Sequence, residues 1–139
     1  MEKTAKTEKG SERYIEAIGR RKTSSARVRI TPASKTTFSL NDKDLNTYFP
    51  TEEMRLVAVK PLKEGKFGTF KVTVVLKGGG IHSQAEALSH ALARVLIKNE
   101  GELRKELKKD GFLKRDARMK ERRKFGLKKA RKAPKWSKR

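Results

Sequence analysis

The alternation of apolar and polar residues predicts several short strands in the first half of the chain. Residues 14–18 favour a strand that ends at Gly19, and residues 25–30 alternate apolar with cationic positions, the period-two pattern of a half-buried strand. Residues 37–40 predict a shorter strand that ends at the Asn41–Asp42 turn.

The most regular patterns lie between residues 67 and 99. Residues 67–76 predict the strongest strand, with one apolar face formed by Phe70, Val72, Val74 and Leu76. After Gly78–Gly80, a helix to about Asn99 carries one apolar stripe made of Ile81, Ala85, Leu88, Leu92, Val95 and Leu96. Ser83 and Glu86 have the spacing of a capping box at its start. This helix is the best candidate for the core helix.

Shorter helices are expected elsewhere. Residues 44–48 suit one helical turn, and Thr51 suits the N-cap of a helix that must end before Pro61. Another short helix should contain Leu107 and end at Gly111.

Charge identifies the class of partner. The 139 residues include 37 Lys and Arg against 16 Asp and Glu, a formal net charge of +21. Such a chain attracts polyanions, with nucleic acid the leading candidate and an acidic membrane surface the second. There is no cysteine, which excludes thiol catalysis, disulfides and thiolate metal sites. No apolar run approaches the ~20 residues that span a bilayer.

The charge is unevenly distributed along the chain. Residues 104–139 hold 18 Lys and Arg against four acidic residues, a net charge of +14. We therefore divide the chain into a disordered stub (residues 1–12), a globular body (13–103) and a basic C-terminal extension and tail (104–139). The tail should be extended or partly helical, and poorly ordered without its partner. The polar stub has no signal-peptide pattern, so we expect a cytoplasmic protein.

Two basic loops of the body are candidate phosphate contacts. One is the hairpin of residues 19–27, whose candidates are Arg20, Arg21, Lys22, Thr23 and Arg27. The alternative there is a merely soluble hairpin. The other is the turn of Lys77, Gly78 and Gly79, where glycines and a helix start could approach a phosphate. Plain turn geometry explains that turn equally well, and it lacks the ending of a P-loop.

The tail is the strongest candidate interface. Its cationic runs can neutralise phosphates and release counterions; they include Arg122, Arg123, Lys124, Lys128, Lys129, Arg131 and Lys132. Phe125 and Trp136 could stack on bases or could pin the tail to protein. Elsewhere, His82 and His90 have no ligand cluster or catalytic partner around them, so we expect neither an enzyme nor a cofactor or metal site.

Ordered motifs over residues 14–139 resemble the bacterial type of the ninth small-subunit ribosomal protein family. The motifs are Gly19–Ser24 with Ala26–Val28, Asn41–Phe49, Lys77–Ile81 with Gln84–Ala85, His90 and Ala93–Arg94, then Leu103–Arg104, Leu107–Lys108, Gly111–Leu113, Arg115–Arg118, Glu121–Arg122, Lys124, Gly126–Arg131 and Ser137–Arg139. Trp136 stands where the family commonly has Phe or Tyr, and His82, Ser83 and Glu86 stand where small residues are common. Glu86 would repel a nearby phosphate.

The resemblance implies an α+β fold: a two-layer α/β sandwich with a mixed sheet of about four strands, like the second domain of the fifth small-subunit ribosomal protein, plus an extended basic C-terminal tail. It implies binding to small-subunit rRNA in the head of the subunit, with Arg115 and Arg118 added to the rRNA-binding candidates. The tail tip, Ser137, Lys138 and Arg139, would reach the anticodon stem-loop of P-site tRNA. Neighbouring head proteins are further expected partners, and no stable homo-oligomer or membrane is expected.

Two other classes compete with this interpretation. A free nucleic-acid-binding or architectural protein would share the charge but would not need the Ser-Lys-Arg ending. A small phosphate-handling enzyme on the same broad fold would need a metal-binding carboxylate and a base beside the glycine turn, and neither is identifiable.

Overall fold

The computed structural model of the chain describes residues 13–64 and 67–138. Its elements are, in order, β1 (Ile15–Arg21), β2 (Ser24–Pro32), β3 (Thr37–Leu40), α1 (Leu45–Tyr48), α2 (Glu52–Glu64), β4 (Phe70–Lys77), α3 (Ile81–Asn99), the 3-10 helix η1 (Gly101–Leu103) and α4 (Arg104–Lys109). The predicted stub, residues 1–12, lies outside the described residues.

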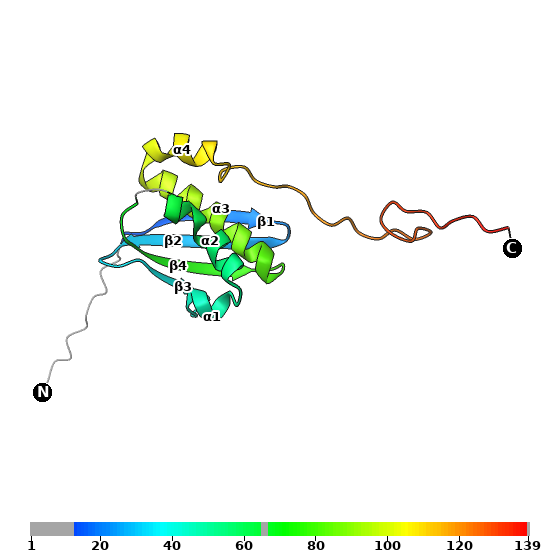
Figure 1. The fold of residues 1–139 in the computed structure, drawn as a ribbon, viewed down its shortest axis with the longest axis horizontal. Helices are drawn as coiled ribbons and strands as arrows, with labels where there is room; N and C mark the ends of the chain where they lie inside the picture. The colour runs from blue at the N-terminus through cyan, green and yellow to red at the C-terminus, as the bar shows by residue number, and fades with distance from the viewer. Residues whose placement is uncertain (1–12, 65–66, 139) are drawn as a thin grey trace, which may run out of the picture.

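The four strands form one mixed sheet in the order β1-β2-β4-β3 (Figure 1). The pairs β1/β2 and β2/β4 are antiparallel, whereas β3 runs parallel to β4. A parallel pair needs a crossover connection, which α1 and α2 supply between β3 and β4. The predicted mixed sheet of about four strands is confirmed.

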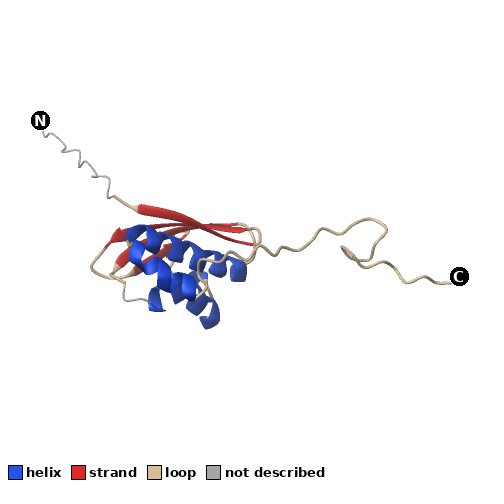
Figure 2. Cartoon of the chain, turned by 90° about the horizontal axis from the view of Figure 1, so that it is seen from above, coloured by secondary structure: helices blue, strands red, loops and turns tan. Residues whose placement is uncertain are grey.

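The helices lie on one side of the sheet and leave its other side open (Figure 2). Each central strand turns alternate apolar side chains toward the helices, Val28 in β2 and Val72 and Val74 in β4 among them. The stripe of α3 packs on this layer, and all of its predicted members are buried except Ile81, which is 46% exposed. The two-layer sandwich predicted from the sequence is therefore confirmed.

Gly19 does not end the first strand, as the sequence suggested; β1 continues through it to Arg21. The glycine is needed instead for the contact between layers. A Cβ atom built on Gly19 would lie 2.2 Å from Ala87 O and 2.3 Å from Ala91 N of α3. Because α3 crosses β1 backbone to backbone at this point, any larger residue would push the helix off the sheet.

Pro61 does not end α2, which continues to Glu64, so the predicted boundary is wrong. Proline at this position loses one helical hydrogen bond. Its side chain is fully buried, however, and the apolar side of α2, which includes Ala58 and Leu62, packs on the core. Tertiary burial here outweighs a local preference that sequence rules treat as decisive.

The C-terminal region begins with the short helix α4, whose Leu107 is buried. The chain then turns at Gly111 (φ +81°), and Phe112 and Leu113 pack against the core. Residues 114–138 contain neither helix nor strand, and Figure 1 shows them leading away from the body. None of the helices in the described ranges is long and apolar enough to cross a membrane.

Candidate nucleic-acid interface

The turn between β1 and β2 is shorter than the basic loop expected from the sequence. Only Lys22 and Thr23 lie between β1 and β2, with Lys22 in the left-handed region at φ +51°. Arg20 and Arg27 belong to the strands and point to solvent, whereas Ser24 is buried beneath the hairpin. The predicted loop candidates are therefore split between a turn and a sheet surface.

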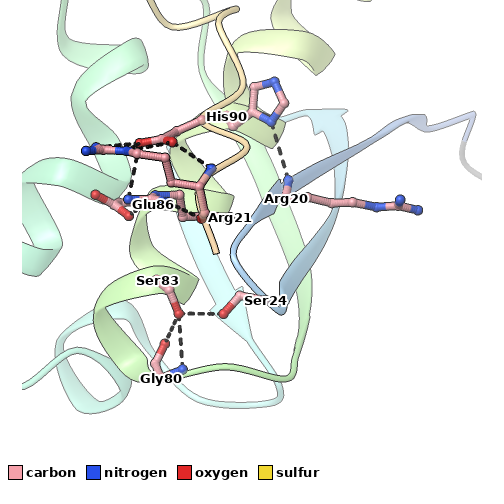
Figure 3. Close-up of polar contacts among 9 residues, drawn as sticks. Arg20, Arg21, Ser24, Gly80, Ser83, Glu86 and His90 are labelled. Carbon is pink, nitrogen blue, oxygen red and sulfur yellow. Dashed lines mark hydrogen bonds and ion pairs between the residues drawn. The ribbon is translucent and has the colours of Figure 1, made fainter. Parts of the chain in front are cut away.

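A network of hydroxyl and amide groups holds the glycine turn between β4 and α3. The Ser24 hydroxyl donates to Gly78 O at 3.1 Å. It also lies 2.6 Å from the Ser83 hydroxyl, which accepts the Gly80 N–H at 3.1 Å (Figure 3). The Gln84 amide donates to Gly78 O at 2.9 Å. The helix start is thus capped by Ser83 alone, and the predicted Ser83–Glu86 capping box is wrong.

Two glycines of this turn are required by the protein itself. Gly78 and Gly79 have φ values of +71° and +62°, and a Cβ on Gly79 would lie 1.9 Å from the Ser24 hydroxyl oxygen. Gly80 has an ordinary φ, and a Cβ there would meet nothing within 4 Å. Turn geometry therefore accounts for Gly78 and Gly79, and phosphate contact at this turn stays a prediction.

Arg21 holds the first residues of the tail against the body. Its Nε donates to Glu86 Oε2 of α3 at 2.7 Å, its Nη2 lies 3.3 Å from Asp116 Oδ2, and its Nη1 donates to Arg118 O at 3.2 Å. Figure 3 shows the side chains of Arg21 and Glu86 in contact. Only 14% of the Arg21 side chain is exposed. Its RNA contact stays a prediction, and its observed contacts are with the tail and α3.

Asp116 is the residue of the tail that forms an ion pair with Arg21. Arg118 Nη2 lies 2.8 Å from Asp116 Oδ2, and the Arg118 N–H donates to Asp116 Oδ1 at 3.0 Å. The hydrogen bonds from Arg118 hold the pKa of Asp116 well below its usual range, with the side-chain bonds contributing most and the backbone bond next. The positive charge of Arg21 lowers this pKa further by a smaller amount. The carboxylate therefore stays ionised and joins the tail to β1. We call Arg21, Glu86, Asp116 and Arg118 the tail-root cluster.

Side chains of α3 cap the free edge of β1, which is an outer strand of the sheet. Arg94 donates to Ile18 O, Lys98 Nζ donates to Glu16 O at 2.8 Å, and the Arg20 N–H donates to His90 Nδ1 at 3.3 Å. Such caps occupy groups that could otherwise pair with another strand. Sequence reasoning missed Arg94 and Lys98 here, although their spacing along one helix could have suggested a shared role.

His90 is half-buried beside β1, where its ring accepts a hydrogen bond from the strand. Desolvation lowers its pKa below the ordinary value of 6.5, and the charges of Arg94 and Arg115 lower it further, although the Leu113 backbone opposes the shift. The neutral ring can accept the Arg20 N–H. A cleft of about 390 Å³ beside it is lined by Arg20, Arg94, Lys98 and Arg115, among others.

The distal tail folds back into a small loop. Arg131 makes two hydrogen bonds to the Glu121 carboxylate, at 2.6 and 2.9 Å, and Lys128 N–H donates to Lys132 O at 2.8 Å. The cations between these points are exposed, and so are Phe125 and Trp136. Ser137 and Lys138 follow, whereas Arg139 lies outside the described residues.

The predicted site residues thus do not converge on one centre. They lie at the hairpin, at the glycine turn, in the tail-root cluster and along the tail. No group of three or more histidine and acidic residues that could hold a metal ion occurs in the part of the chain described. The fold and these surfaces define a small basic α+β protein with a cationic tail.

The family model of ribosomal protein S9/S16 matches this chain over residues 19–139. The chain belongs to this family. It is therefore a structural ribosomal protein of the small subunit, an RNA-binding component of a ribonucleoprotein that serves translation, and its family is not enzymatic. The resemblance drawn from the sequence motifs is confirmed.

Proposed function

We propose that the chain binds small-subunit rRNA in the head of the subunit and extends its tail tip to the anticodon stem-loop of P-site tRNA. One observation carries the proposal: a net charge of +14 over residues 104–139 belongs to a segment whose root is fixed to the body and whose remainder leads away from it (Figure 1). Cations along such an arm can neutralise successive phosphates.

The division of roles follows from the contacts. Arg122, Arg123, Lys124, Lys128, Lys129 and Lys132 are exposed and supply rRNA phosphate contacts, together with Lys22, Thr23 and Lys77 of the body. Ser137, Lys138 and Arg139 are the tRNA-proximal residues. The proposal includes neighbouring head proteins as partners and a cytoplasmic particle as the location.

Sedimentation of a tagged chain tests this proposal. Co-migration with small subunits is expected, and a pool that is wholly free or DNA-bound contradicts it and favours the architectural alternative. Replacing Arg122, Arg123 and Lys124 by Gln together should weaken binding to an rRNA transcript and flatten its salt dependence. Unchanged binding across a salt series would remove this segment from the interface.

A further inference from the structure

The open face of the sheet gathers cations that the sequence places far apart. Residues on this face alternate with the core residues of β1, β2 and β4, and the strand register sets them in rows. One row is Ile18, Arg27 and Val75, and the next is Arg20, Ser25 and Lys77. We call these six residues the open-face patch.

The patch has a hollow with an apolar floor and a cationic rim. A depression of about 200 Å³ is lined by the six residues of the patch and by no others. Its volume is several times the roughly 30 Å³ that one water occupies. Ile18 is 40% exposed, Val75 is partly exposed, and the rim carries three cations. Such a floor suits one face of a flat, uncharged ring.

The three cations of the rim form no ion pair in the described part of the chain, whereas Arg29 on the same face does. Within the described residues, the side chains of Arg20, Arg27 and Lys77 form no ion pair and no hydrogen bond. Two positions along β2, Arg29 is neutralised by Glu16 at 2.6 Å and lies over the Tyr14 ring at 4.5 Å. Three cations without an acidic partner in residues 13–64 and 67–138 therefore surround the hollow.

We propose that the open-face patch binds one unpaired nucleotide of RNA. The base lies on Ile18 and Val75, the flanking phosphates are held by Arg20, Arg27 and Lys77, and the Ser25 hydroxyl is available to the base edge or the 2′-OH. Sheet faces commonly bind unstacked bases in this way, with aromatic floors, and here aliphatic side chains take that place. This inference rests on the proposed function, because it assumes that the natural ligand is rRNA.

Crosslinking to the full chain tests the site directly. A single-stranded oligouridylate containing 4-thiouridine should crosslink to peptides of β1, β2 or β4 as well as to the tail. Crosslinks confined to residues 114–139 would overturn the patch while leaving the proposed rRNA contacts of the tail intact, and would assign the open face to another partner, such as an acidic protein surface. A chain that binds no RNA would overturn both proposals.

Matched variants distinguish RNA binding at the open-face patch from nonspecific attraction by positive charge. Arg27→Gln should weaken oligouridylate binding severalfold and lower the slope of log affinity against log salt by about 1, whereas Arg29→Gln, with the same charge change, should do neither. Ile18→Ala should weaken single-strand binding about fivefold and leave binding to an RNA duplex unchanged. Ile81→Ala, at a similarly exposed isoleucine on α3, should affect neither. Urea denaturation checks that all four variants are folded. The proposal would be overturned if Arg27→Gln bound oligouridylate as Arg29→Gln does, or if Ile18→Ala bound it as Ile81→Ala does.

Discussion

Arg21 in β1 reaches Asp116 at the start of the tail, with its Nη2 3.3 Å from Asp116 Oδ2. The same guanidinium contacts Glu86 in α3 at 2.7 Å, so one side chain joins strand, helix and tail. Partly buried ion pairs with several hydrogen bonds restrain geometry better than exposed pairs do. The direction in which the tail leaves the body therefore depends on Arg21.

Arg21→Gln should loosen the root of the tail. Amide hydrogen exchange in residues 114–118 should become at least about threefold faster, because local opening no longer breaks the contacts to Asp116 and Arg118 O. Arg20→Gln is the control: it removes the same charge one residue earlier, where the side chain points away from the tail (Figure 3). Similar exchange in the wild type and Arg21→Gln would show that the cluster does not restrain the tail.

Asp116→Asn separates positioning from charge. The substitution makes the protein more positive, and electrostatics alone would strengthen its binding to an rRNA transcript. If the tail-root cluster orients the arm, affinity should instead fall by about two- to threefold. Asp110→Asn, an equal charge change at an exposed site at the end of α4, should leave affinity unchanged or slightly higher. Tighter binding by Asp116→Asn in a filter assay would contradict the positioning role.

His90 should make stability depend on pH. Because its folded pKa lies below 6.5, the unfolded chain takes up a proton first as pH falls, so the free energy of unfolding decreases below about pH 6.5 and levels off once the folded ring is protonated. Urea denaturation at several pH values checks this. His90→Asn, which offers an amide oxygen near the Nδ1 position, should abolish this component, whereas His82→Asn, at an exposed site, should retain it.

The glycine turn offers a contrast between neighbouring positions. Gly79→Ala should lower the free energy of unfolding by at least about 2 kcal/mol, because its φ is +62° and a Cβ would collide with Ser24. Gly80→Ala should lower the free energy of unfolding by less than about 1 kcal/mol. The added Cβ meets no neighbouring atom, and only the preference for glycine at the N-cap is lost. Equal losses in chemical denaturation would mean that the turn is not held by Ser24 and Ser83.

Much of this fold could be predicted from the sequence because its periodicities are regular. The alternation in β2 and β4 and the stripe of α3 identified the core, with Ile81 as the exception. Predictions failed where tertiary packing overrides local preference. Pro61 was expected to end α2, but its burial in the core keeps it inside the helix. Gly19 was expected to end the first strand, but β1 continues through it, and the glycine allows α3 to approach closely.

The candidate interface was only partly predictable for a related reason. Charge identified the basic segments, but charge carries no information about pairing. Nothing local shows that Arg21 is used by Glu86 and Asp116, 65 and 95 positions away, while Arg20 beside it faces solvent. The grouping of Arg20, Arg27 and Lys77 likewise depends on strand register, which the sequence leaves open.

The arm toward the tRNA is the central claim, and deleting residues 137–139 tests it most directly. Small subunits reconstituted with the shortened chain should contain it at full stoichiometry, because the body and the remaining tail cations are intact. Dissociation of tRNA from the P site of these subunits should be severalfold faster than from subunits with the full chain. An unchanged dissociation rate at full stoichiometry would contradict the account.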